Sequence, residues 1–117
     1  MSDQSASPFF ESLARIEENA VSSAREALQG APPIWAERPE VFVRLAEVCS
    51  TGEAAEDFAA AVWEFVHVAI HSALVVMDGG AADADVDVQL TDGAGNSMGS
   101  GLHERFVDYL FETNRLE

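Results

Sequence analysis

The chain has 117 residues, with 21 acidic side chains and 6 basic ones, all of them Arg, so its formal net charge is −15. Neither Arg nor Lys occurs from Leu45 to Glu104, a stretch that holds eleven Asp and Glu residues. Such a surface repels phosphate backbones and anionic lipid headgroups, which argues against nucleic acids and membranes as ligands. It favours a basic protein partner or a cation.

Length and composition predict residues 1–6 as a disordered tail and residues 7–117 as a single compact acidic domain. Apolar residues make up 48% of the chain, enough for one hydrophobic core despite the charge. The single cysteine, Cys49, excludes an intramolecular disulfide, and the first residues lack the basic and apolar regions of a signal peptide. The most apolar stretch, Phe58 to Met77, contains three polar side chains that a membrane span rarely carries: Glu64, His67 and His71. We therefore expect a cytoplasmic protein.

A first helix is predicted from Ser7-Pro8, where Ser caps the helix and Pro occupies its first turn, to Gly30. Spacings of three and four define its apolar stripe, which comprises Phe9, Leu13, Ile16, Ala20, Ala24 and Ala27. Pro32-Pro33 prevents any continuation. In the loop that follows, Ile34 and Trp35 are expected to dock on the core.

A second helix is predicted from Pro39 to about Ser50, and a third from about Glu53 to Gly79-Gly80. The third helix is apolar on nearly all sides, which is typical of a buried central helix. Its last apolar run, Leu74 to Met77, is rich in β-branched residues and could form a strand instead. We favour the helix.

The sequence period changes to two from Ala84 to Thr91, where apolar residues alternate with Asp and Gln. This pattern predicts a strand with one buried face, followed by a turn over 92–96 and a short returning strand over 96–99. A last helix follows, for which Ser100 could provide the cap. The predicted fold is therefore α+β, with three N-terminal helices, a β-hairpin and a C-terminal helix around one core. The hairpin could extend a sheet across a homodimer.

The three histidines suggest a metal site. His67 and His71 are one helical turn apart, with Glu64 on the same side, and His103 begins the last helix. If the last helix packs antiparallel to the third, His103 approaches the C-terminal end of that helix, where Asp78 lies. Two imidazoles one turn apart are half of a Zn²⁺ or Fe²⁺ site. The alternative is that they are hydrogen-bonded polar members of a buried helix.

Three shorter motifs have simpler explanations. The Gly-x-Ser-x-Gly pattern over 95–99 lacks the acid and histidine that should follow a nucleophilic serine, which favours an ordinary turn around Ser97. The segment 99–101 could bind an anion through backbone N–H groups, but capping fits the acidic surroundings better. Asp83, Asp85 and Asp87 fail the spacing of a calcium loop and are interpreted as a solvated strand face or a docking surface for a basic partner.

Three hypotheses about function follow. The first is a small acidic interaction protein, such as an inhibitor, an immunity-type protein or an adaptor, that binds a basic partner. The second is a metal-binding protein or metal-dependent enzyme that uses His67, His71 and His103. The third is a homodimeric scaffold built by sheet extension or by a buried helix face. No combination of nucleophile, base and oxyanion donors is recognisable, so the sequence favours the first hypothesis over an enzyme.

Overall fold

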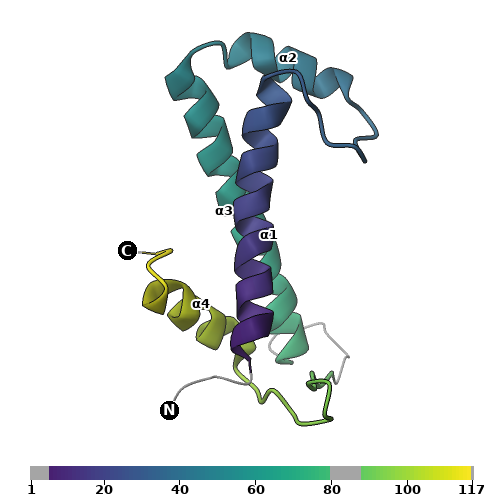
Figure 1. Ribbon diagram of the computed structural model, residues 1–117, viewed down its shortest axis with the longest axis vertical. Helices are drawn as coiled ribbons and strands as arrows, with labels where there is room; N and C mark the ends of the chain where they lie inside the picture. Colours follow the sequence, from purple (N-terminus) through teal and green to yellow (C-terminus); the bar gives the residue numbers. More distant parts are fainter. Residues whose placement is uncertain (1–5, 80–87, 117) are drawn as a thin grey trace. The chain divides into compact units, whose positions relative to one another are not determined.

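The computed structural model of the chain describes residues 6–79 and 88–116. These residues contain four helices and no β-strand: α1 (Ser7–Leu28), α2 (Glu40–Val48), α3 (Gly52–Met77) and α4 (Leu102–Glu112) (Figure 1). Helices account for 66% of the described residues. The predicted α+β fold with a β-hairpin is therefore wrong, and the described residues form an all-α structure.

The chain divides into two compact units. The terminal unit comprises Met1–Ala14 and Val68–Glu117, and the central unit comprises Arg15–His67. The helices α1 and α3 each contribute residues to both units. The prediction of one domain over residues 7–117 stays a prediction.

The helix ends follow the local chemistry that the sequence indicates. α1 stops two residues before Gly30, which has a φ of +99°, and α3 stops two residues before Gly79, which has a φ of +75°. Both glycines occupy the left-handed region that other residues adopt only with strain. The stretch from Leu74 to Met77 is helical, which confirms the choice of helix over strand.

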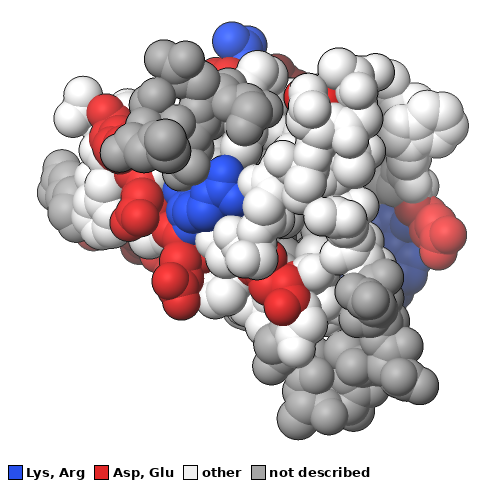
Figure 2. All heavy atoms as spheres, turned by 90° about the horizontal axis from the view of Figure 1, so that it is seen from below, with Lys and Arg blue, Asp and Glu red and all other residues white. Residues whose placement is uncertain are grey.

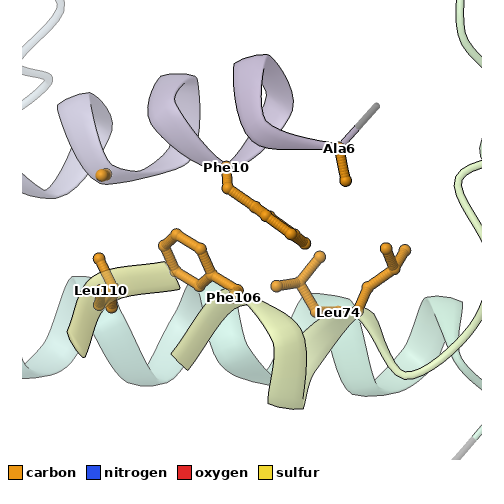
Figure 3. Packing of buried hydrophobic residues seen from close by; sticks show 7 residues of the cluster. Ala6, Phe10, Leu74, Phe106 and Leu110 are labelled. Carbon is orange, nitrogen blue, oxygen red and sulfur yellow. The ribbon is translucent and has the colours of Figure 1, made fainter. Parts of the chain in front are cut away.

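The terminal unit has a hydrophobic core formed by α1, α3 and α4. Its fully buried side chains are Ala6, Phe10, Ala14, Leu74, Leu102, Phe106 and Leu110. Figure 3 shows Phe10 of α1, and Ala6 just before that helix, pointing toward Leu74 of α3 and toward Phe106 and Leu110 of α4. The Phe10 and Phe106 rings are 5.8 Å apart between centroids at a tilt of 37°, a favourable aromatic arrangement.

Polar contacts fasten the C-terminal end of the chain to α1 within this unit. Tyr109 donates its hydroxyl hydrogen to Glu11 Oε1 at 2.6 Å, and Arg115 Nη2 donates to Glu11 Oε2 at 2.9 Å. The hydrogen bond to Glu11, burial and the nearby carboxylate charge raise the pKa of Tyr109, so this phenol stays protonated as a donor.

The central unit buries fewer large side chains than the terminal unit. Residues of α1 and α3 lie side by side in it, held by Arg25 to Glu56 and by Glu17 to His67. Its buried residues are Glu17, Ala24, Ala27 and Ala59, and α2 buries none of its residues. The buried stripe on α1 is thus rotated from the predicted one, since Ile16 is 52% exposed while Glu17 is buried.

Two further predictions about burial are wrong. Ile34 and Trp35 do not dock on the core, because both side chains are about nine-tenths exposed, at 91% and 90%. The helix α3 is not a buried central helix either, since of its residues only Ala59 and Leu74 are buried. A helix that is apolar on every side can be buried on every side. The pattern does not show that other residues of the same chain bury it.

The predicted hairpin reduces, in the described part of the chain, to one isolated antiparallel bridge between Thr91 and Ser97. A side chain takes backbone groups that would extend the ladder. Arg105 Nη1 donates to the carbonyls of Met98 and Ser100 at 2.6 and 3.2 Å. A single bridge cannot form a sheet. The first half of the predicted strand, residues 84–87, lies outside the described residues.

Candidate functional site

The loop between α1 and α2 presents two large apolar side chains to solvent. Ile34 and Trp35 lie at its tip, between Pro33 and Pro39. A turn closes the tip, since the Ala36 N–H donates to the Pro33 carbonyl at 3.0 Å. Proline fixes φ and limits the backbone conformations of the loop, which lowers the backbone entropy that binding would cost.

Two hollows lie beside this loop. One, of about 410 Å³, is lined in part by Leu28 of α1 and by Phe42 and Val43 of α2. The other, of about 470 Å³, is lined in part by Trp35, Val41 and Phe42. Together with the exposed Ile34 and Trp35 they form a grooved apolar surface, which we call the Trp35 surface.

The charges around the Trp35 surface are mainly negative. The carboxylates Glu37 and Glu47 line the two hollows, and the one guanidinium among the lining residues, Arg38, donates from Nε to Glu40 Oε1 at 3.2 Å. The central unit as a whole has ten Asp and Glu residues against four Arg. Figure 2 shows, on the face that it draws, acidic groups and several Arg groups among uncharged residues.

One side of α3 is also exposed and apolar. It comprises Ala61, Phe65, Val68, Ala69, Ser72, Ala73 and Val76, which we call the α3 face. Phe65 is 77% exposed and Val68 57%. By length and composition alone α3 could span a membrane, and 6% of its most apolar stretch is buried. This face therefore lacks a cover among the described residues.

A buried carboxylate and an imidazole meet in the central unit. Glu17 Oε2 lies 2.7 Å from His67 Nδ1, and the His67 ring stacks on Trp63 at 4.6 Å between centroids. Glu17 is 1% exposed. Burying its charged carboxylate without such a partner would cost free energy of folding. Sequence reasoning missed Glu17. Its position four residues after Leu13, inside the apolar half of α1, was the available signal.

A second carboxylate and imidazole meet in the terminal unit. Asp78, just after α3, accepts hydrogen bonds from the backbone N–H groups of Leu102 and His103, both at 3.0 Å, and contacts His103 Nδ1 at 2.5 Å. The His71 ring meets the His103 ring edge-on at 5.3 Å. The predicted approach of His103 to the C-terminal end of α3 is thus confirmed.

Asp78 acts as the N-terminal cap of α4. The residue at the cap position, Gly101, has no side chain to do so, and the predicted cap Ser100 does not take the role. Burial opposes ionisation of Asp78, but the hydrogen bonds from the His103 N–H, its ring and the Leu102 N–H outweigh burial and hold the pKa below 3.8. The N–H groups of Leu102 and His103 at the start of α4 therefore bind a carboxylate of the same chain.

The three histidines of the predicted metal site have different neighbours. His67 pairs with Glu17, His103 pairs with Asp78, and His71 contacts the His103 ring. Within residues 6–79 and 88–116, no group of three His, Cys, Asp or Glu side chains is placed to hold a metal ion. The Zn²⁺ or Fe²⁺ site stays a prediction that no geometry supports here.

The remaining candidates are a turn and a stretch that lies outside the described residues. Ser97 takes part in the turn, accepting from Gln89 Nε2 at 2.9 Å as well as from the Gly99 N–H. Asp92 closes the same turn, and the N–H groups of Asn96 and Ala94 lower its pKa by hydrogen bonding, despite an opposing contribution from desolvation. The predicted docking residues Asp83, Asp85 and Asp87 lie outside the described residues.

Comparison with known proteins gives no relative. No protein-family model, curated protein or solved structure matches this chain. The function must therefore be argued from its surfaces.

Proposed function

We propose that this chain is an acidic interaction protein that binds a basic protein partner through the Trp35 surface. The observation that carries this proposal is the exposure of Ile34 and Trp35 on a loop held between prolines, beside a helix, α2, that buries none of its residues. An inhibitor, an immunity-type protein or an adaptor would use such a surface.

Large, fully exposed aromatic side chains are costly in a protein that works alone, but Trp is among the residues that contribute most to binding energy in interfaces. The hollows on both sides of α2 supply the shape into which a partner's side chains can insert. The partner should therefore offer apolar side chains at the centre of its binding surface.

Charge supports a basic rim on that partner. Carboxylates border the two hollows, and the guanidinium of Arg38 is already engaged by Glu40. Opposite charge would accelerate association, and screening would weaken it as salt rises.

The test is a selection from a displayed library of amphipathic peptides on the immobilised protein at low salt. Binding is then measured by fluorescence in a Trp63→Phe background, where Trp35 is the only Trp. We expect enrichment of peptides that combine Lys or Arg with aromatic or aliphatic residues. We also expect a blue shift of Trp35 emission and at least tenfold weaker binding, about 1.4 kcal/mol, for Ile34→Ala.

The matched control is Phe65→Ala, which removes an exposed apolar side chain from α3 and should leave peptide binding unchanged. Equal recovery of acidic and basic peptides would contradict the proposal. So would peptides that bind Trp35→Ala as tightly as the native protein.

A further inference from the structure

A third hollow lies at the C-terminal end of α1, where the chain enters the loop that leads to α2 (Figure 1). It has a volume of about 390 Å³, and all of its lining residues belong to one stretch of the central unit. They include Ser23, Glu26, Pro32, Pro33, Ile34 and Trp35. We call it the Glu26 hollow, because Glu26 is the charged residue among those that line it. The hollow thus combines apolar walls with a single negative charge.

Local hydrogen bonds fix the shape of the Glu26 hollow. At the end of α1, the Ala31 N–H donates to the Glu26 carbonyl at 3.0 Å and the Gly30 N–H donates to the Ala27 carbonyl at 3.3 Å. This pair of bonds is a Schellman motif, and Gly30 supplies the positive φ that the motif needs. The motif turns the chain back beside Glu26. The walls of the hollow are therefore held in place before a ligand binds, which lowers the cost of binding.

The charges at the Glu26 hollow favour a cation. The C-terminal end of a helix is the negative end of its dipole. The basic residue in the last turn of α1, Arg25, already donates two hydrogen bonds of 2.8 Å to Glu56. In the described part of the chain, no side-chain hydrogen bond or ion pair engages the Glu26 carboxylate. An anion or a purely apolar group would cover this carboxylate without giving it a partner, which costs free energy.

Among cationic side chains, Arg suits the Glu26 hollow better than Lys. A guanidinium is planar and can donate to both oxygens of a carboxylate. It is also less strongly hydrated than an ammonium, and it stacks on aromatic rings, of which Trp is the best acceptor. Trp35 lines the hollow together with Glu26, so both kinds of contact are offered in one place. The aliphatic stem of an Arg would contact Pro32, Pro33 and Ile34.

We infer that the Glu26 hollow binds an arginine side chain of the partner, with the guanidinium held by Glu26 and Trp35. This inference rests on the proposed function, because it names the group of the basic partner that the loop recognises. The two hollows beside α2 are then left for the apolar side chains of the same partner.

The test uses the amide of N-acetylarginine as a probe, compared with the corresponding lysine amide and with the neutral citrulline amide. Binding is followed by ¹H–¹⁵N NMR on the native chain, whose two Trp residues give separate indole N–H signals. We expect the arginine amide to shift the Trp35 indole signal and the Glu26 backbone signal, and to leave the Trp63 indole signal unchanged. The lysine amide should bind about threefold more weakly, and the citrulline amide should cause no shift.

The decisive variant is Glu26→Gln, which removes the charge but keeps the size of the side chain. It should weaken binding of the arginine amide about fivefold. The matched control is Glu18→Gln, which makes the same change on the same helix about 12 Å away along its axis and should leave binding unchanged. Equal affinities for the three amides would overturn the inference, and so would equal effects of the two variants.

Peptides selected from the library separate this inference from the proposed function. Peptides that require Trp35 but bind Glu26→Gln as tightly as the native chain would overturn the arginine site and leave the proposed function standing. Binding of the arginine amide that depends on Glu26, without any enrichment of basic peptides, would support the arginine site and contradict the proposed function.

Discussion

The terminal and central units use similar helices but bury very different side chains. The terminal unit brings three helical segments together around Phe10, Leu74, Phe106 and Leu110, so its large apolar residues are covered by their own chain. The central unit fully buries only alanines and one carboxylate, Glu17, and leaves several large apolar residues, among them Ile34, Trp35 and Phe65, exposed to solvent.

The apolar residues of the two units have different roles. In the terminal unit they stabilise the fold, since burying one Phe or Leu is worth about 1.5–3 kcal/mol. In the central unit Ile34, Trp35 and Phe65 give the monomer little stability and leave surface for other molecules. The comparison thus separates residues that hold the fold from residues available for binding.

The largest expected effect tests the terminal core. Phe106→Ala should lower the free energy of unfolding by about 3–5 kcal/mol, because it leaves a cavity beside Phe10. Urea denaturation followed by circular dichroism measures it. The control is Phe111→Ala on the same helix, a half-exposed site where the loss should stay below about 1 kcal/mol. Equal losses at the two positions would contradict the assignment of the core.

A smaller effect is expected at the polar contact of the central unit. His67→Phe keeps a ring against Trp63 but removes the imidazole that meets the buried Glu17. We expect a loss of about 2 kcal/mol, below the usual range for a broken buried pair because His67 is partly exposed. The control, Glu64→Ala one turn earlier, should change stability little.

A second substitution distinguishes pairing from packing. Glu17→Leu combined with His67→Phe removes both polar groups and should recover much of the loss, because no carboxylate then stays buried without its imidazole. Additive losses in the double variant would show that Glu17 and His67 act independently. The same unfolding curves provide this measurement.

The sequence predicted the positions of the helices well, but it predicted poorly which helix surfaces are buried. The predicted ends of α3, near Glu53 and Gly79, lie within two residues of the observed ends, because caps and helix-ending glycines act locally. The cap itself is Thr51, whose Oγ1 accepts from the Ala54 N–H at 3.1 Å.

Burial depends on which surfaces of the chain pack against each other, and the periodicity of the sequence does not contain this information. Trp35 was therefore wrongly predicted to lie in the core. In the described part of the predicted hairpin, Arg105, from outside the predicted strands, takes the carbonyls of Met98 and Ser100 that a longer ladder would need.

The smallest expected effect concerns Asp78, which caps α4 within the terminal unit. Its pKa is held below the ordinary 3.8, so its contribution to stability is present above that value and is lost as pH falls through the folded-state pKa. Asp78→Asn keeps an acceptor oxygen but removes the charge, and should cost about 1–2 kcal/mol at neutral pH. The stability difference between native and Asp78→Asn protein should therefore shrink below about pH 4, as unfolding curves at several pH values would show. Asp108→Asn, an exposed carboxylate on the same helix, should show no such convergence. A gap that stays constant down to acid pH would mean that Asp78 stabilises α4 through shape alone, and that the charge of the cap contributes nothing.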